Sequence, residues 1–327
     1  MLKLPMDVLE QFPVRKTKVQ KEAFCAAVTA YVEGLGYDCR EETGSFHCKN
    51  LVIGDPENAK FLVTAHYDTC AGMLFPNFLT PCSLPGFLLC QLMQLIFIGL
   101  ASFTLAIFEG LLIAGFGSLI GIDLGDAWIL FVSLVTPTLT GFNMIPVVLW
   151  MMFGPANKHN SNDNTSGVVT LLEIARTMPE NQRHKVCFVL FDLEEAGLIG
   201  SAFYRKAHRQ ATNRQIVLNL DCVGDGDHLR MFPTKALVKN RERLTSLYKA
   251  CGYFGKKNLL VQEKGWHIYP SDQMHFPYGV GICALRKWKK ILYMSRIHTK
   301  KDTFLDETNV NILRAALTTF ICRDAVQ

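Results

Sequence analysis

The sequence predicts an α/β fold: a three-layer α/β/α sandwich with a mixed, mainly parallel central sheet and an inserted hydrophobic helical hairpin. Short apolar runs, typical of buried strands, alternate along the chain with segments whose apolar residues recur at helical spacing. Two long stretches without a charged residue, 86–108 and 127–153, interrupt this alternation. The first observation predicts the sandwich and the second predicts the hairpin.

Composition limits the classes of function. The chain has 327 residues, of which 49% are hydrophobic and 19% charged, with a formal net charge of +5. This charge is small and spread out, without a basic stripe carrying aromatic residues, so we expect no binding to nucleic acid. The eleven cysteines have no Cys-x-x-Cys pair and no disulfide-framework spacing, which indicates reduced thiols in a cytosolic setting. Residues 1–20 are charged and lack the apolar core of a secretory signal.

The elements before the insert are a helix, a hairpin and a strand. Residues 16–35 have apolar side chains at helical spacing, and Gly36 follows where a helix C-cap belongs. Residues 39–53 alternate weakly around a Thr-Gly turn, as a β-hairpin does. Residues 61–65 form a short apolar run, which predicts a buried strand that ends on His66.

The uncharged stretches 86–108 and 127–153 are each long enough to span a membrane, which takes about 20 apolar residues. Pro137 and Pro146 would kink the second span, which neighbouring helices tolerate. The mostly apolar segment 109–126 between the spans is expected to lie in the membrane interface or to re-enter. The alternative is a buried hairpin, an apolar lid or a dimer surface of a soluble protein.

After the insert the alternation resumes. Helices are expected over 167–178, 202–209, 238–251 and 307–322, and strands over 186–191, 215–220 and 279–285. Because the strands before and after the insert follow the same pattern, we expect residues 1–82 and 154–327 to form one discontinuous domain. Residues 83–153 are then the hydrophobic insert, a transmembrane hairpin.

The most informative turn follows the strand 186–191, which ends in Asp192, Glu194 and Glu195. Adjacent carboxylates at a strand end repel each other, and partial burial penalises both. A bound cation removes this cost: one glutamate binds it, while the other points elsewhere and handles a proton. The alternative is a solvated acidic turn that suits the N-terminus of the next helix.

Metal-binding residue types recur at four other places, each beside a strand end or in a polar turn. They are His66 with Asp68, then Asp163, Asp221 and His298. Histidine and carboxylate ligands without a thiolate suit zinc or another divalent ion. Three carboxylates and two imidazoles suffice for two metals if one carboxylate bridges. Any one of these residues alone is more often a helix cap or a surface group.

Taken together, these segments resemble the co-catalytic di-zinc exopeptidases, a family of bacterial leucyl aminopeptidases, glutamate carboxypeptidases and glutaminyl cyclases. The matching segments, in the family's order, are Thr64-Ala65-His66-Tyr67-Asp68-Thr69, Asn162-Asp163-Asn164-Thr165-Ser166-Gly167, Asp192-Leu193-Glu194-Glu195-Ala196-Gly197, Asn219-Leu220-Asp221, and Ile297-His298-Thr299 with Asp302-Thr303. The match covers the chain except the insert. In the family's Ser-Asp-His-x-x-Phe segment, Gln273 stands in place of the histidine. Asn160-Ser161-Asn162 replaces the usual Gly-Ala-x before Asp163.

The resemblance implies a role for each matching residue. Asp163 bridges two Zn²⁺ ions, His66 and Asp221 complete one site, and Glu195 and His298 complete the other. Glu194 is the general base on the bridging water, and Asp68 orients His66 as the second catalytic residue. The spacing agrees, because residues two apart in an extended chain point the same way, while the neighbours Glu194 and Glu195 point apart.

The function implied is a zinc-dependent exopeptidase, in the first place an aminopeptidase that removes N-terminal residues from peptides. Other divalent ions are possible in place of zinc. Two alternatives remain: a glutaminyl cyclase-like acyltransferase, which usually works with one zinc, and an inactive receptor or scaffold of the same fold. None of the expected ligands is missing, and the peptidase-like turn at Asp163 argues against the cyclase.

A cytoplasmic catalytic domain follows from charge. Residues of one site lie before and after the insert, so the insert must cross the membrane an even number of times. The loop between the spans has Glu109, Asp123 and Asp126 but no lysine or arginine, whereas Lys60 and Lys158 lie on the flanks. Because positive charge favours the cytoplasmic side, we expect the enzyme there, with a soluble cytoplasmic protein as the alternative.

Overall fold

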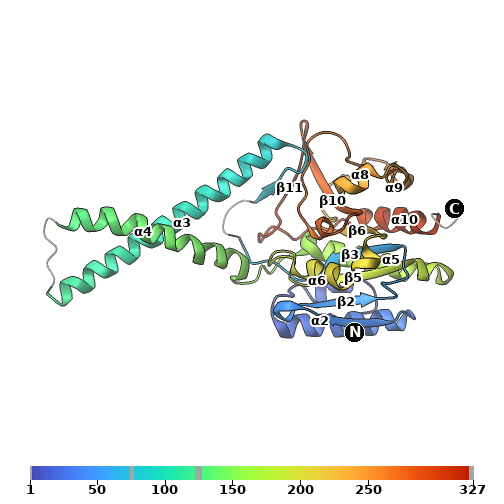
Figure 1. Ribbon diagram of the computed structural model, residues 1–327, viewed down its shortest axis with the longest axis horizontal. Helices are drawn as coiled ribbons and strands as arrows, with labels where there is room; N and C mark the ends of the chain where they lie inside the picture. Colours follow the sequence, from blue (N-terminus) through green and yellow to red (C-terminus); the bar gives the residue numbers. More distant parts are fainter. Residues whose placement is uncertain (1, 74–76, 122–126, 324–327) are drawn as a thin grey trace.

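The structure is a computed structural model that describes residues 2–73, 77–121 and 127–323 (Figure 1). Within these residues, eleven strands form one mixed sheet. They are β1 (Cys39–Thr43), β2 (Lys49–Ile53), β3 (Phe61–His66), β4 (Phe78–Leu79), β5 (Val186–Phe191), β6 (Ile216–Leu220), β7 (His228–Pro233), β8 (Gly252–Phe254), β9 (Lys257–Val261), β10 (Gly279–Trp288) and β11 (Ile291–Ser295).

The centre of the sheet is parallel. Strand β3 lies between β5 and β6 and runs parallel to both, and β10 continues the parallel set beside β6. Antiparallel pairs extend it on both sides, β1 and β2 beyond β5, and β7 beyond β10. The expected mixed, mainly parallel sheet is confirmed. His66 and the acidic turn after Phe191 therefore lie at one edge, where the carboxyl ends of neighbouring strands meet.

The central strands are buried on both faces, which is why they read as continuous apolar runs. In β3, the side chains of Phe61, Val63 and Ala65 join one core cluster and Leu62 joins another. The first cluster includes apolar residues of the helices α2 (Lys18–Gly34), α5 (Gly167–Thr177) and α10 (Glu307–Arg323), and the second includes Tyr204 of the helix α6 (Ile199–Ala207). Because successive side chains of a strand point to opposite faces, β3 contacts helices on both sides of the sheet, as a three-layer sandwich requires.

The helices around the sheet mostly follow the predicted positions. They are α1 (Asp7–Gln11), α2 (Lys18–Gly34), α5 (Gly167–Thr177), α6 (Ile199–Ala207), α7 (Arg209–Thr212), α8 (Lys235–Lys239), α9 (Arg241–Leu247) and α10 (Glu307–Arg323). The single helix expected over 238–251 is wrong. The chain breaks at Asn240, whose side chain accepts a hydrogen bond from Arg243 N and begins α9.

The insert forms two long helices, α3 (Leu84–Leu119) and α4 (Ala127–Phe153), which pack against each other and project from the body (Figure 1). α3 continues unbroken through Glu109 to Leu119, so the first part of the segment 109–126 does not turn back as a re-entrant element. Its location in a membrane interface stays a prediction. Asn143 Nδ2 donates to Glu109 Oε2 at 2.8 Å, which gives this carboxylate a partner within the helix pair. Asp123 and Asp126 lie outside the described residues.

Candidate metal centre

The structure brings together the five residues expected to bind metal. His66 ends β3, Asp221 follows β6, and Glu195 lies in the turn after β5. Asp163 lies in the irregular helical turn Ser161–Ser166 before α5, and His298 lies in the loop after β11. His66 Nε2 lies 3.3 Å from Asp163 Oδ1 and 3.6 Å from Asp221 Oδ1. His298 Nε2 lies 2.9 Å from Asp163 Oδ2 and 3.4 Å from Glu195 Oε2. One oxygen of Asp163 thus faces His66, and the other faces His298.

The longest of these separations fits metal ligation better than a direct hydrogen bond, whereas the 2.9 Å between His298 and Asp163 is a hydrogen-bond distance. A 3.6 Å contact between His66 and Asp221 is too long for a hydrogen bond. Zinc bonds of about 2.0–2.2 Å in a tetrahedron place neighbouring ligand atoms roughly 3.3–3.6 Å apart. Glu195 Oε1 is buried and has no hydrogen-bond partner among the described residues. The set of histidines and carboxylates therefore suits two divalent ions, one on each side of Asp163.

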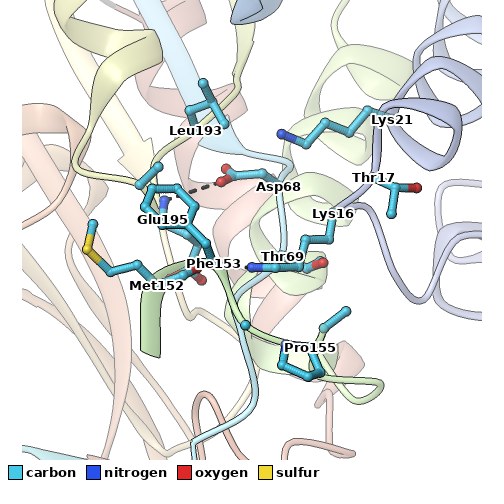
Figure 2. A pocket seen from close by; sticks show the side chains of 13 residues that line it. Lys16, Thr17, Lys21, Asp68, Thr69, Met152, Phe153, Pro155, Leu193 and Glu195 are labelled. Atoms are coloured by element: carbon cyan, nitrogen blue, oxygen red, sulfur yellow. Dashed lines mark hydrogen bonds between the residues drawn. The ribbon is translucent and has the colours of Figure 1, made fainter. Parts of the chain in front are cut away.

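Asp68 contacts the acidic turn as well as His66, which was the only contact predicted for it from the sequence. Its Oδ1 lies 3.4 Å from His66 Nδ1, so the other ring nitrogen of His66 is left to face Asp163 and Asp221. The same carboxylate accepts hydrogen bonds from the backbone N–H group of Glu194 at 3.1 Å and from that of Glu195 at 3.2 Å, the second of which is drawn in Figure 2. One buried carboxylate thus fixes both the imidazole and the acidic turn.

Glu194 lies with His66 and Asp221 in a group whose ligand atoms are within 4.8 Å of one another. Burial is the largest influence on its carboxyl group and raises its pKa well above the usual value, and the nearby Glu195 and Asp272 act in the same direction. A raised pKa is what a general base working near neutral pH requires.

Asp302 holds the backbone of Asp163 in place. Asp302 belongs to one of the segments that resemble the family, but no role was predicted for it from the sequence. Its two oxygens accept hydrogen bonds from the backbone N–H groups of Asn162 at 2.7 Å and Asp163 at 3.0 Å. Burial raises the pKa of Asp302 to about 8.

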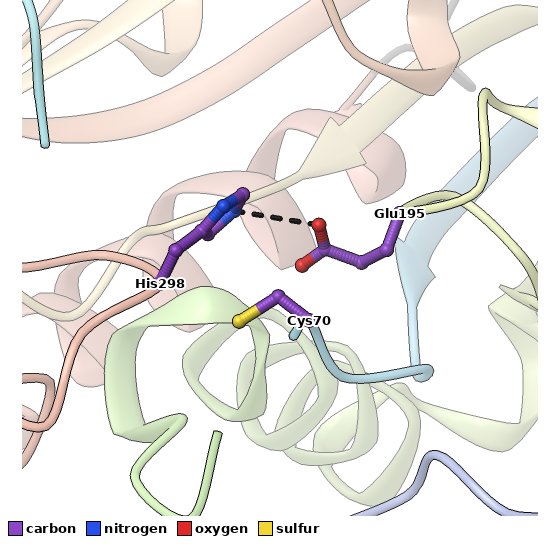
Figure 3. Close-up of side chains that lie close together, drawn as sticks. All are labelled: Cys70, Glu195 and His298. Atoms are coloured by element: carbon purple, nitrogen blue, oxygen red, sulfur yellow. Dashed lines mark ion pairs between the residues drawn. The ribbon is translucent and has the colours of Figure 1, made fainter. Parts of the chain in front are cut away.

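Two cysteines beside the site were not identified from the sequence as candidates. Cys70 lies near Glu195 and His298 (Figure 3), and Cys222 lies near Asp163 and Asp221. Burial raises the pKa of both thiols well above the usual value. The only available signal was proximity in sequence to Asp68 and Asp221, which does not distinguish a neighbour from a ligand.

A buried cation behind the site was also missed. Arg15 is fully buried, and its Nε donates to the carbonyl of Tyr67 at 2.5 Å, while its Nη1 donates to Thr165 Oγ1 at 3.1 Å. These bonds tie the N-terminal segment to the residues beside His66 and Asp163. Because the site concentrates carboxylates, a fixed positive charge nearby reduces their mutual repulsion.

Gln273, which departs from the family's segment, has a structural role. Its side chain is buried, donates to the carbonyl of Tyr269 at 2.6 Å and accepts from Asn219 Nδ2 at 3.1 Å. The preceding residue, Asp272, is fully buried near the site, and burial raises its pKa to about 7.

The crowded carboxylates predict a pH-dependent stability for the metal-free protein. Burial raises the pKa of Glu195 from 4.5 to about 8, so folding binds a proton between these values and stability falls as pH rises. The pKa of His298 is raised from 6.5 to about 9: burial alone would lower it, but Glu195 and Asp163 outweigh that effect. The contribution of His298 to stability is complete below pH 6.5 and is lost as pH rises towards 9. Stability therefore changes in the same direction as for Glu195.

We therefore expect the melting temperature of the chelator-treated protein to decrease as pH rises from about 5 to 9. Excess zinc should raise it most at the alkaline end, where the site is deprotonated. Thermal unfolding at fixed ionic strength, with and without zinc, measures both effects. A metal-free protein that becomes more stable across this range would contradict the electrostatic description.

Fold and site together describe an α/β protein with a candidate dinuclear metal centre at the carboxyl edge of its sheet. Residues 153–320 match the model of peptidase family M28, and this is just over half of the 327 residues. The chain belongs to peptidase family M28. No curated protein sequence matches it.

Solved structures with the same fold include both chemistries of the family. A glutaminyl cyclase from Porphyromonas gingivalis is similar with a TM-score of 0.56 and 14% identity, over 98% of this chain and 96% of that one. A Zn-dependent exopeptidase from Parabacteroides distasonis has a TM-score of 0.55 and 15% identity, over 97% and 94%. An aminopeptidase from Legionella pneumophila has a TM-score of 0.56 and 14% identity, over 99% and 70%. At these identities the likeness shows the fold alone.

Proposed function

We propose that the chain is a zinc-dependent aminopeptidase that removes N-terminal residues from peptides. Membership of family M28 supports a metallo-exopeptidase. The observation that carries the proposal is the position of Asp163, whose two oxygens face separate groups at 3.3 Å from His66 and 2.9 Å from His298. Two sites sharing a carboxylate suit hydrolysis with two metals, whereas a glutaminyl cyclase-like enzyme usually works with one.

The chain's residues then have distinct parts in the reaction. Bound zinc supplies Lewis-acid polarisation and a lowered pKa for an attacking water. Glu194, which lies with His66 and Asp221 at the site, would take a proton from that water and deliver it to the leaving amine. Asp68 holds His66 and the backbone of Glu194 and Glu195, so that base and ligands keep their relative positions.

A substrate panel tests this function. The purified full-length protein in detergent should hydrolyse unblocked dipeptides and aminoacyl-coumarins when supplied with zinc, and N-acetylated versions should resist. Conversion of an N-terminal glutaminyl peptide to its cyclic product would support the cyclase instead. An inactive scaffold would do neither, even with metal bound.

We further propose that residues 83–153 form a membrane-spanning hairpin attached to one discontinuous domain, 1–82 and 154–327. Two helical stretches, 84–119 and 132–153, are long and apolar enough to cross a membrane, with mean hydropathies of 2.2 and 1.5. In their most apolar windows only 11% and 6% of residues are buried within the chain, unlike the core helices of a soluble protein. A bilayer would cover this exposed apolar surface.

Fractionation should accordingly place the full-length protein in the membrane pellet, resistant to carbonate and released by detergent. Deletion of 83–153 with a short linker should move it to the supernatant. A full-length protein that stays in the high-speed supernatant without detergent would contradict the anchor.

The proposed orientation places the catalytic domain in the cytoplasm, because Lys60 and Lys158 flank the hairpin while its loop is acidic. In a background without other reactive thiols, a single cysteine at 122–126 should react with an impermeant maleimide on intact cells. A cysteine in place of Lys239 should not react until the cells are opened. The reverse pattern would place the active site outside.

A further inference from the structure

The cavity beside the candidate metal centre, of about 550 Å³, is lined by four segments that are distant in the sequence (Figure 2). Asp68 and Glu195 belong to the metal centre. Met152 and Phe153 end the helix α4, and Lys16 comes from the N-terminal segment. The proposed chemistry gives Lys16 no part, although it shares a cavity with two residues of the site.

The backbone of Lys16 is held firmly. Its N–H donates at 3.1 Å to Gln20 Oε1, the oxygen that also accepts from Thr17 N in the capping box that begins α2. The preceding residue is the buried Arg15. The ammonium of Lys16 reaches across to donate to the carbonyl of Met152 at 3.1 Å (Figure 2). A residue fixed in this way holds its charge in a defined place.

Lys16 makes no ion pair within the described part of the chain, although the carboxylates of Asp68 and Glu195 line the same cavity. The second lysine of the cavity, Lys21, is paired with Asp192 at 2.5 Å. Lys16 has no carboxylate within 4.0 Å among the described residues, and an ammonium has three N–H donors, of which one is used here. Two donors are therefore left for a negatively charged or polar group in the cavity.

The part of a substrate that suits this cavity follows from charge. The free amine of an aminopeptidase substrate is a cation, which Lys16 repels. The residue released after the scissile bond has no such charge, and in a dipeptide it has a free carboxylate. Met152, Phe153 and Leu193 give the cavity apolar surface for its side chain. A volume of about 550 Å³ is within the range of small-molecule pockets.

We infer that Lys16 binds the carboxylate of the leaving residue and makes the enzyme selective for dipeptides with an apolar second residue. The inference rests on the proposed peptidase function. Lys16 is then a specificity residue, since it contacts the far end of the substrate and none of the reacting bonds. Chromogenic amides without a carboxylate should be poor substrates for the same reason.

A purely structural role for Lys16 makes a different prediction. As a cation bonded to the last turn of α4, it would stabilise the end of that helix. Its loss would then lower turnover of all substrates together. The ratio between a substrate with a carboxylate and the same substrate without it would stay constant.

The experiment compares three peptides, Leu-Leu, Leu-Leu-amide and Leu-Glu-amide, with the zinc-loaded full-length protein in detergent. Wild type should prefer Leu-Leu over Leu-Leu-amide in kcat/KM by about ten- to a hundredfold, the range expected for a hydrogen bond to a charged group. Lys16→Met should lower kcat/KM for Leu-Leu to the value for Leu-Leu-amide, and should leave kcat/KM for the amide unchanged. Lys16→Arg should keep part of the preference for Leu-Leu. Lys18→Met, at an exposed position two residues along, is the matched control and should change nothing.

Equal rates of wild type on Leu-Leu and its amide would overturn the inference, as would an equal loss on both in Lys16→Met. Leu-Glu-amide separates the two sources of a carboxylate. If Leu-Glu-amide has the same kcat/KM as Leu-Leu, Lys16 binds the carboxylate of a side chain, and the inferred selectivity for dipeptides is wrong. Absence of turnover with all three peptides would overturn the peptidase function itself, and this inference with it.

Discussion

Glu194→Gln is expected to lower kcat by about 10²–10⁴-fold while the protein stays folded and keeps its metal. The amide has nearly the same shape as the carboxylate but does not accept a proton, so only the proton transfer is lost. Glu194 is not needed to complete either side of Asp163, whose contacts are made by His66 and His298.

Turnover, bound zinc and melting temperature should be measured together on Glu194→Gln. Glu180→Gln, at an exposed position away from the site, is the matched control and should behave as wild type. If Glu194→Gln retained more than about a tenth of the wild-type kcat, the general-base role would be wrong.

Asp163→Ala is expected to abolish activity by removing the carboxylate that both sites share. Zinc content should fall towards zero, because each remaining group has lost one of its close carboxylates and keeps a single histidine. Asp221→Ala should mainly lower zinc binding at the site that contains His66, because Asp221 lies beside His66. Equal zinc loss in both variants would contradict a bridging Asp163.

Asn162→Ala serves as a comparison for Asp163→Ala because it changes the same buried turn without removing a carboxylate. Asn162 Oδ1 accepts from Gly224 N at 2.7 Å, so some stability should be lost. Zinc content should be retained. Circular dichroism shows whether each variant has kept its fold.

The strand ends could be predicted from the sequence because the apolar runs stop abruptly there. In Phe61–His66 and Val186–Phe191 every residue is buried, and polar groups follow at once. Parallel pairing then brings those polar ends to one edge of the sheet without further information. This is why His66, Glu195 and Asp221 could be placed together before the structure was known, whereas Asp163 and His298 lie away from these strand ends and were assigned as ligands from the family resemblance.

The edges of the fold are less visible in the sequence. The strands β7, β8, β9 and β11 were not expected, and β8 has only three residues, none of them buried. Such strands are stabilised by pairing with neighbours rather than by their own pattern. The extent of α3 was missed for a similar reason: Glu109 reads as the end of an apolar stretch until Asn143, far along the chain, provides its partner.

Residues that support the site from other segments were hidden as well. Arg15 contacts Tyr67 and Thr165, and a distance of 150 positions separates it from the latter. A single arginine in a charged N-terminal segment predicts an exposed side chain. Only the folded chain shows that this side chain is buried behind the carboxylates.

The most direct measurement of the central claim is the zinc content of the wild-type protein. After removal of metal and dialysis against excess zinc, elemental analysis should find two ions per chain, and calorimetric titration should show two binding events. Glu194→Gln should bind the same number. One ion or fewer at saturating zinc would contradict two sites that share Asp163.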